Sequence, residues 1–559
     1  MAKRYRPVNR DQPFLLPLDM REWLPREHPV WLVITVVEDH LDTSVFHAAR
    51  KTGGAGTAGY DPDMLVTLLV WAYAHQVTSS RRIEALCQSD VAFRVICGQN
   101  APRHVTISQF RAGFPGLAAE FFAQVLMLCA RLGMGKLGVV ALDGMKIAAS
   151  ASASANRAEE ALAKLAAETV ARHGETDAAE DDLFGPGARG DEVPGDDGEG
   201  RWSPRRRGER IAAALAGLQA ERQAAEAEAG QQAADYLAHQ GQGRPGAPPA
   251  SAAVAAARVR LEAARAARVA QIAGLERRAA GPKITGSRRD RPRAGVEDYC
   301  LVKAARDALA KAEARAAART PAGGTRGPVR NITDPDSRLM PVRGGGFIQG
   351  YNPQNVTTQD GLIIATELTA DTTDTTWFEP MLRHAEHAAR LITAHHPPPA
   401  AQTATQTSPA HGPATAATSL IGLFLADAGY LSEHNLAAAG PDRLIATGKT
   451  RDLNKTARDP SQPTPAPWTS PAITAMAARL ATEDGITAYR QRSHIAETPH
   501  GHIKHNMRFR QLTMRGKPKA AAEWTFTAAV HNLFKAITTG HLTTTALDHL
   551  ASHPAPQPT

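Results

Sequence analysis

Several features that define large protein classes are scarce or missing in this chain of 559 residues. It has four cysteines, and none of them stands in the CxxC spacing of a metal or redox site. No apolar run reaches the roughly 18 residues that a membrane span needs. We therefore exclude a disulfide framework, a cysteine-based metal site and a membrane-spanning protein, and expect a soluble protein of the cytoplasm.

Two common catalytic signatures are also missing. We find no Ser/His/Asp nucleophile motif and no phosphate-cradling glycine loop, since the glycines at 344–346 precede a strand pattern and not a helix. Lys and Arg together number 64 against 56 Asp and Glu, which gives a net charge of +8. This surplus fits a polyanionic partner, and its distribution along the chain matters more than its sum.

The first 130 residues have the periodicity of helices. Apolar residues recur every three to four positions in MLVTLLVWAYAHQ and again in FPGLAAEFFAQVLMLCARLG. Between these runs, Thr106 or Ser108 is the expected cap of a helix that carries Gln109 and Arg111. A helix-turn-helix would place these two side chains in a major groove. A small packed helical bundle explains the pattern equally well.

Short buried strands follow. The runs LGVVAL and LIGLFLA predict strands that end directly before Asp143 and Asp427, and RLIA predicts a further strand. FIQGYNPQNVT and GLIIATELT predict a hairpin with its turn at 359–361. Between the first strand and the hairpin, residues 157–330 are rich in Ala, Arg and Glu and predict a helical, partly disordered insertion.

Asp143 and Asp427 each follow a buried strand, and ligands bind at the carboxyl ends of strands in open α/β sheets. One Asp in that place is more often a helix cap or a turn former. Two of them favour a shared site. We interpret two other acids, Asp371 and Asp374, as the loop and cap before a helix that carries Trp377.

A third acid, Glu497, lies in a strongly basic segment. Its spacing to its neighbours is Tyr489-x2-Arg492-x4-Glu497-x6-Lys504. Pro499 fits the first turn of a helix better than its interior, so we expect a helix that begins near Glu497 or bends there. Between 488 and 520, Glu497 is the single acid among the basic residues Arg490, Arg492, Lys504, Arg508, Arg510, Arg515, Lys517 and Lys519.

The alternative to a functional role for Glu497 is a solvated basic helix with one salt bridge within the helix. The histidines of this segment, His494, His500, His502 and His505, fit no tetrahedral zinc template well. We interpret them as residues of the helix surface near nucleic acid.

Three carboxylates beside a basic surface suit metal-assisted cleavage of phosphodiesters. Mg²⁺ binds through a few carboxylates together with phosphate oxygens. Two ions roughly 3.5–4 Å apart can activate the attacking oxygen and stabilise the leaving one. Flanking Lys and Arg side chains neutralise and position the nucleic-acid backbone.

In combination, these motifs resemble the bacterial insertion-sequence transposases of the DDE superfamily. The matching segments are LDGMKIAASASASAN, NITDPDSRLM, IQGYNPQN, LADAGYLSEHNL, the stretch from Tyr489 to Lys504 and FRQLTMRG, with SSRRIEALCQSDVAFRVICG and HVTISQFR nearer the N-terminus. The resemblance covers most of 1–156 and 331–535.

The resemblance implies an α/β fold, a ribonuclease-H-like mixed sheet flanked by helices. It implies that Asp143, Asp427 and Glu497 are catalytic and bind two Mg²⁺ ions, which Mn²⁺ can replace. The residues expected on DNA are Tyr489, Arg492, Lys504, Arg508, Arg510, Gln109 and Arg111. One departure concerns Arg492, which four residues and not the commonest three separate from Glu497.

The expected segments are a helical DNA-binding domain (1–130), the first part of the catalytic core (131–156), the insertion (157–330), the rest of the core (331–540, with a linker at 396–418) and a tail (541–559). The implied activity is DNA transposition in the bacterial cytoplasm. The partners would be terminal inverted repeats and target DNA, bound by at least a dimer. A Mg²⁺-dependent nuclease without strand transfer and a decayed repressor of its own locus remain open as alternatives.

Overall fold

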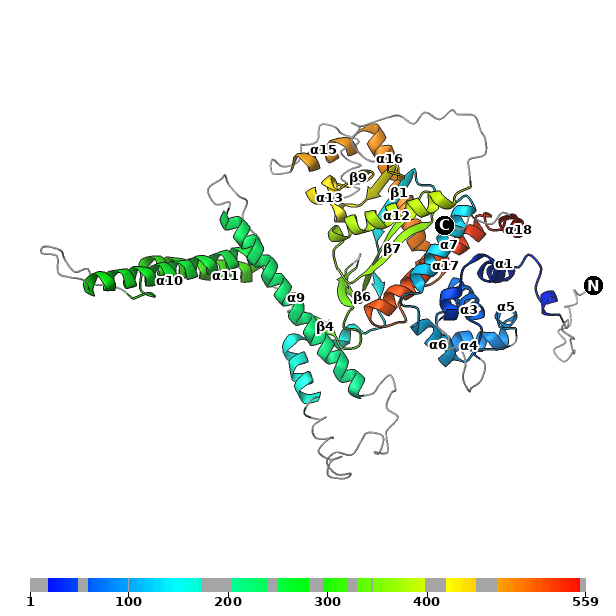
Figure 1. Ribbon diagram of the computed structural model, residues 1–559, viewed down its shortest axis with the longest axis horizontal. Helices are drawn as coiled ribbons and strands as arrows, with labels where there is room; N and C mark the ends of the chain where they lie inside the picture. The colour runs from blue at the N-terminus through cyan, green and yellow to red at the C-terminus, as the bar shows by residue number, and fades with distance from the viewer. Residues whose placement is uncertain are drawn as a thin grey trace, which may run out of the picture. The chain divides into compact units, whose positions relative to one another are not determined.

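The computed structural model describes residues 19–48, 59–98, 100–169, 171, 204–238, 250–280, 295–319, 329–342, 345–397, 419–448 and 470–552. The chain divides into two compact units (Figure 1). The first comprises residues 1–155 and 336–559, and the second comprises residues 156–335. Nearly all of the linker predicted at 396–418 lies outside the described residues.

The N-terminal part of the first unit is helical. Its elements are η1 (Met20–Glu22), α1 (Pro29–Thr35), the π-helix η2 (Val36–His40), α2 (Ser44–Ala48), α3 (Pro62–Ala74), α4 (Ser80–Ser89), α5 (Val91–Ile96), α6 (His104–Ala112) and α7 (Ala118–Arg131). α3 is buried along most of its length because its sequence is apolar on nearly every side. α6 begins at His104, so Thr106 and Ser108 lie inside this helix and do not cap it.

A mixed sheet of seven strands forms the centre of the first unit. The strands are β1 (Val139–Gly144), β2 (Ile147–Ala148), β5 (Arg338–Pro341), β6 (Phe347–Thr358), β7 (Ile363–Thr369), β8 (Leu423–Ala426) and β9 (Asp442–Ile445). Asn355 of β6 pairs with both Asp143 and Thr366, so β1 and β7 lie on opposite edges of β6. The order is therefore β7-β6-β1-β8-β9, and β6 runs antiparallel to the other four strands. The predicted hairpin is confirmed as β6 and β7.

The remaining elements of this unit are η3 (Ala153–Ala155), η4 (Thr375–Trp377), α12 (Phe378–His395), η5 (Ala428–Tyr430), α13 (Glu433–Ala437), α15 (Pro471–Leu480), α16 (Glu483–Gly501), the π-helix η6 (His502–Asn506), α17 (Lys517–Thr538) and α18 (Thr544–Ser552). Leu547 and Leu550 of α18 are buried in the main core. The tail predicted from residue 541 therefore includes a packed helix.

The two faces of the sheet are covered by different helices, because successive strand residues point to opposite faces. Leu142 of β1 belongs to a large core that includes residues of α7, α12 and α17. Ala141 and Leu425 belong to a second cluster with residues of α15 and α16. Asp143 and Asp427 lie two residues beyond these, and the alternation therefore puts both on the face that α16 covers.

The N-terminal helices share the main core with the sheet and do not form a separate unit. The rings of Phe121 on α7 and Phe526 on α17 stack with their centroids 5.2 Å apart. Tyr73 of α3 donates a hydrogen bond of 2.9 Å to Glu523 of α17. α17 thus packs against the N-terminal helices as well as against the sheet (Figure 1).

The second unit is built from long, Ala-rich helices. They are the helical residues 159–169, α9 (Pro204–Ala238), α10 (Ala250–Ala280) and α11 (Cys300–Arg319), of which α10 and α11 lie side by side (Figure 1). β3 (Asn156–Ala158) pairs antiparallel with β4 (Val329–Asn331), so the two ends of this unit are adjacent. No described helix in the chain is both long enough and apolar enough to cross a membrane.

Candidate active site

Asp143 and Asp427 meet at one edge of the sheet. β1 and β8 are parallel neighbours, and the residues directly before the two acids, Leu142 and Ala426, are paired in register. Asp143 Oδ1 accepts a hydrogen bond of 3.0 Å from the next N–H in the chain, and Asp427 Oδ1 accepts one of 2.9 Å from the Gly429 N–H. These bonds fix each carboxylate at the end of its strand.

α16 brings a positive charge to both acids. Arg492 Nη2 lies 2.9 Å from Asp143 Oδ1 and 3.7 Å from Asp427 Oδ2, and the Arg492 side chain is only 9% exposed. The contacts lack hydrogen-bond geometry and are electrostatic. Tyr489 lies one turn earlier and donates a hydrogen bond of 3.2 Å to the Ala426 carbonyl. The helix is thereby attached to the end of β8.

Burial and charge act against each other in this cluster. Burial raises the pKa of Asp427, Arg492 lowers it, and the neighbouring Asp143 raises it again, so that it ends above the usual range. Burial opposes the charge of Arg492, but Asp143 favours it, and the pKa of Arg492 ends above its usual value. Burial also raises the pKa of Tyr489 to about 12.

His500 lies on the same helix and faces Asp143, where its Nδ1 is 3.8 Å from Asp143 Oδ2. Asn355 Oδ1 accepts hydrogen bonds from Thr366 and Trp524, so the Asn355 amide nitrogen must point to His500 Nε2, 2.9 Å away. His500 Nε2 is then the acceptor, and Nδ1 carries the proton toward Asp143. Burial lowers the pKa of His500 to about 3. His500 is therefore a neutral, buried residue, and its interpretation as a surface residue is wrong.

Glu497 lies on α16 between Arg492 and His500, three residues before the latter. Its side chain is exposed, and its negative charge raises the pKa of His500. In the described part of the chain, the three predicted acids do not form a group whose ligand atoms all lie within 4.8 Å of one another. α16 begins at Glu483 and contains Pro499, which corrects the expectation that a helix begins near Glu497.

The other predicted DNA contacts of this segment follow the helix. Lys504 lies in η6 and is half-buried, and its charge lowers the pKa of His500. Arg508 and Arg510 are exposed, and Arg510 Nε donates a hydrogen bond of 3.2 Å to the Lys504 carbonyl. A basic surface thus continues from the end of α16.

Asp374 belongs to this site, although its position in the sequence predicted a helix cap. It precedes η4, and its side chain makes no capping hydrogen bond there. Its Oδ1 accepts hydrogen bonds from Asn352 (2.7 Å) and Gln354 (2.8 Å), and its charge raises the pKa of Asp427. A signal was present in the sequence: Asn352 and Gln354 alternate in a buried strand and need polar partners.

Lys146 is a further residue of this site, and no role is predicted for it from the sequence. It follows Asp143 by three residues, and its Nζ lies 4.0 Å from Asp374 Oδ1. Nζ donates a hydrogen bond of 3.1 Å to the Thr372 carbonyl. Burial lowers the pKa of Lys146, while Asp374, Asp371 and Asp427 raise it. The carboxylates therefore have cations on two sides, Lys146 and Arg492.

Two glycines keep the space around the carboxylates free. A Cβ atom at Gly429 would lie 3.0 Å from Asp427 Oδ1 and 3.4 Å from Asp374 Oδ2. At Gly144 it would lie 2.8 Å from Asp374 Oδ1. The polar atoms nearest Gly429 are carboxylate oxygens of Asp427 and Asp374, the ligands that Mg²⁺ and Mn²⁺ prefer, whereas Gly144 also has the Gln354 amide nitrogen beside it. The residues present therefore fit a divalent cation.

The two residues of the N-terminal helices that are predicted to contact DNA, Gln109 and Arg111, differ in exposure. Gln109 is exposed on α6. Arg111 is 7% exposed and donates to the Tyr73 hydroxyl (3.1 Å), the Thr78 carbonyl (2.6 Å) and the Ser80 hydroxyl (2.9 Å). Arg111 is a structural residue in this arrangement, which corrects its expected place in a DNA groove.

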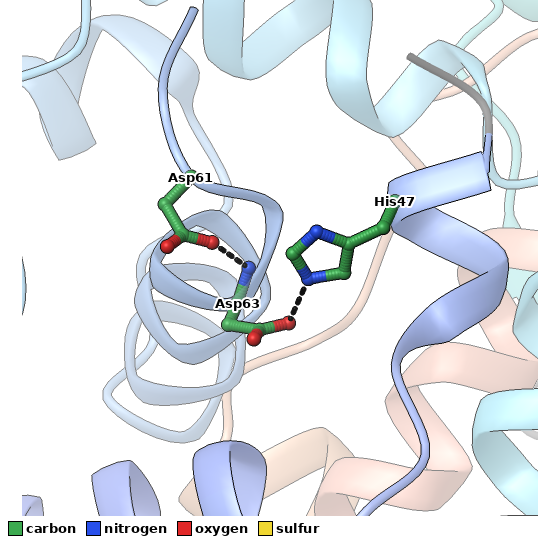
Figure 2. A group of neighbouring side chains, drawn as sticks. All are labelled: His47, Asp61 and Asp63. Atoms are coloured by element: carbon green, nitrogen blue, oxygen red, sulfur yellow. Dashed lines mark hydrogen bonds and ion pairs between the residues drawn. The ribbon is translucent and has the colours of Figure 1, made fainter. Parts of the chain in front are cut away.

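A separate group of possible metal ligands lies on α2 and α3 (Figure 2). Asp61 is the N-cap of α3 and accepts a 2.9 Å hydrogen bond from the Asp63 N–H, and Asp63 pairs with His47 Nε2 at 3.0 Å. His47 and Asp61 are exposed and Asp63 is half-buried. Helix capping and this pair account for the group.

Comparison with known proteins gives two matches to family models. Residues 18–113 match a family described as Transposase domain (DUF772), and residues 454–537 match a family described as Transposase DDE domain. The two matches support an insertion-sequence transposase of the DDE type. The DDE match contains Glu497, Arg492 and Tyr489, whereas Asp143 and Asp427 lie outside it. No curated protein and no solved structure matches the chain.

The two transposase domains imply DNA binding, and a DDE domain is typical of an enzyme that cuts and transfers DNA. DDE transposases generally use divalent metal ions, which agrees with the oxygen donors around Asp143 and Asp427.

Proposed function

We propose that this DDE transposase is catalytically active and that Asp143, Asp427 and Glu497 are its catalytic acids. The observation that carries the proposal is the convergence of Arg492 and His500, from the helix that bears Glu497, on the two strand-end aspartates. The strand order β7-β6-β1-β8-β9 with β6 antiparallel supports a ribonuclease-H-like core.

Asp143 and Asp427 would hold Mg²⁺, or Mn²⁺ in its place, and Glu497 would complete a site for two ions. Such ions supply an activated water and neutralise the departing oxygen. Neutral His500 faces Asp143 with its Nδ1–H at 3.8 Å, and Arg492 would hold the two carboxylates together before DNA binds. Lys504, Arg508, Arg510 and the exposed Gln109 would contact DNA.

Hydrolysis at an element end would free a 3′-hydroxyl. This hydroxyl would then attack a phosphodiester of the target, so that one P–O bond forms as another breaks. No covalent bond to the protein is needed. The partners would be terminal inverted repeats and target DNA, bound by a dimer or larger assembly in the bacterial cytoplasm, where the complex would associate with the nucleoid.

The test uses the purified full chain on labelled DNA that contains its own gene and the flanking sequence. Mg²⁺, Mn²⁺ and EDTA are compared for the wild type, Asp427→Asn, Glu497→Gln and the control Asp548→Asn, which changes an exposed acid of α18. We expect metal-dependent nicks at two fixed positions in the wild type and the control only.

The alternatives give different products. Cleavage without joined donor–target molecules would favour a nuclease. Binding without cleavage under both metals would favour a decayed repressor. Equal cleavage by Glu497→Gln and the wild type would show that Glu497 is not a catalytic acid.

A further inference from the structure

A buried polar network surrounds Asp374 at the edge of the active site. Asn352 Nδ2 bridges Asp374 Oδ1 (2.7 Å) and the Asp371 carbonyl (3.2 Å), while Gln354 Nε2 donates to the same Asp374 oxygen (2.8 Å). Gln354 Oε1 accepts a short hydrogen bond from the Tyr430 hydroxyl. Asn352, Gln354 and Tyr430 are fully buried, so the Asp374 carboxylate is held rigidly.

This network also contains one buried hydrogen-bond acceptor that is not used. Asn352 Oδ1 is buried and has no hydrogen-bond partner among the described residues. It lies near Gly144 together with Asp374 Oδ1, since a Cβ there would be 3.1 Å and 2.8 Å from the two oxygens. Gln354 Nε2 lies 2.6 Å from the same Cβ position and already donates to Asp374, so the unpaired Asn352 oxygen and the anionic Asp374 oxygen attract a further cation or strong donor.

The cation nearest to the Asp374 carboxylate on this side is Lys146. Its side chain is 21% exposed, its Nζ is 4.0 Å from Asp374 Oδ1, and the charge of Asp427 acts on it. Among the described contacts, the Thr372 carbonyl takes one of its three N–H donors. Lys146 is thus placed at the active site with donor capacity left for an anion.

We propose that Lys146 binds a backbone phosphate of the DNA strand in the active site and that Asp374 is the positioning residue that holds its ammonium there. The proposal rests on the function proposed above. Lys is a compact point charge suited to phosphate, and a fixed carboxylate restricts its flexible stem to one location. Phosphate would then be contacted from the side of β1 as well as from α16.

The experiment measures DNA affinity against KCl concentration, with Ca²⁺ in place of Mg²⁺, on the same gene-and-flank DNA. The variants are Lys146→Gln, Lys146→Arg, Asp374→Asn and the double variant Lys146→Gln/Asp374→Asn. Asp374→Asn removes the charge but keeps an oxygen for both amide donors. Lys136→Gln, an exposed lysine before the start of β1, is the matched control. Thermal unfolding confirms that each variant is folded.

We expect Lys146→Gln to weaken DNA binding about tenfold and to lower the slope of log affinity against log salt by about 0.9, as loss of one phosphate contact does. Lys146→Arg should restore most of the affinity, and Lys136→Gln should leave affinity and slope unchanged. Asp374→Asn should weaken binding in the wild type but not in the Lys146→Gln variant, because the two residues act as one unit.

Two results would overturn the proposal. An unchanged salt slope in folded Lys146→Gln would mean that Lys146 is only a counter-ion of the carboxylates. Loss of Mn²⁺ binding by Asp374→Asn to the same degree as by Asp427→Asn, measured by calorimetry without DNA, would make Asp374 a metal ligand. If the proposed function itself is wrong, the cleavage assay shows it separately, because the wild type then makes no metal-dependent nicks.

Discussion

Arg492 Nη2 lies 2.9 Å from Asp143 Oδ1, so a guanidinium occupies the side of the carboxylate where a metal ion would also be attracted. The same nitrogen faces Asp427 at 3.7 Å. Half-buried carboxylates that act on each other through their charges repel each other unless a cation lies near both. Arg492 therefore stabilises the arrangement of the two acids and competes with the ion that they are proposed to bind.

This competition predicts the effect of Arg492→Gln on metal binding. At pH 8 we expect Mn²⁺ to bind Arg492→Gln more tightly than the wild type, because no fixed cation has to be displaced. Isothermal titration calorimetry without DNA measures this. Arg492→Lys keeps a positive charge and is the control. Weaker Mn²⁺ binding by Arg492→Gln would show that Arg492 assembles the site and does not compete for it.

A second prediction concerns stability at Asp427. Its pKa in the folded protein is raised above 3.8, chiefly by burial, so its ionisation disfavours the folded state. This destabilisation develops as pH rises from the pKa of an unfolded aspartate to the raised pKa, and it is complete above the raised pKa. Asp427→Asn keeps the oxygen that accepts the Gly429 N–H and removes the charge. Its Tm should exceed that of the wild type at pH 7.

The difference in Tm between the wild type and Asp427→Asn should shrink as pH falls toward the pKa of an unfolded aspartate. The exposed Glu433→Gln is the control and should show no such trend. A lower Tm for Asp427→Asn at pH 7 would mean that the pair with Arg492 outweighs the burial of the carboxylate.

His500 gives a prediction with the opposite sign in pH. Its folded pKa is about 3, below the ordinary value of 6.5, because it is buried as the neutral form. Stability from this residue is therefore present above pH 6.5 and is lost as pH falls through that value toward 3. NMR of the imidazole should show the neutral Nδ1–H tautomer at pH 5. An imidazolium there would contradict the hydrogen-bond assignment with Asn355.

The strand-end acids could be predicted because they depend on local sequence. Each follows a short apolar run, and parallel strands bring their carboxyl ends to one edge. His500 and Asp374 could not be assigned in this way. Their roles come from partners on β6, which lies about 150 and 20 residues away in sequence, respectively.

Arg111 shows the same limit in the N-terminal helices. Its place on α6 suggested a DNA contact, but the hydroxyls of Tyr73 and Ser80 bind its guanidinium inside the core. Periodicity shows which face of a helix is apolar. It does not show that a charged side chain on that helix is buried by packing against distant segments.

This difference between neighbours on α6 can be tested with two alanine variants. Arg111→Ala leaves the Thr78 carbonyl and two hydroxyls without this donor, so the free energy of unfolding should fall by about 1–3 kcal/mol. Gln109→Ala changes an exposed side chain and should alter it by less than about 0.5 kcal/mol. Urea unfolding measures both. Weaker DNA binding by folded Arg111→Ala, with unchanged stability, would restore the DNA-contact role.

The last prediction concerns the second unit. Asn156–Ala158 pairs with Val329–Asn331, and Asn331 Nδ2 donates a 3.0 Å hydrogen bond to Asn156 Oδ1, so the chain enters and leaves this unit side by side. Residues 159–328 can therefore be replaced by Asn-Gly, which forms a tight turn between antiparallel strands. Ile332 packs against the core of the second unit and is changed to Thr in the same variant.

The shortened variant should fold, because the sheet, the N-terminal helices and every proposed metal ligand belong to the first unit. We expect one cooperative unfolding transition in calorimetry and Mn²⁺ binding equal to that of the full chain. Its control is the Ile332→Thr substitution in the full-length chain. Loss of Mn²⁺ binding in the shortened variant alone would show that the second unit supports the active site. Intact Mn²⁺ binding with loss of strand transfer would instead assign the second unit to DNA handling.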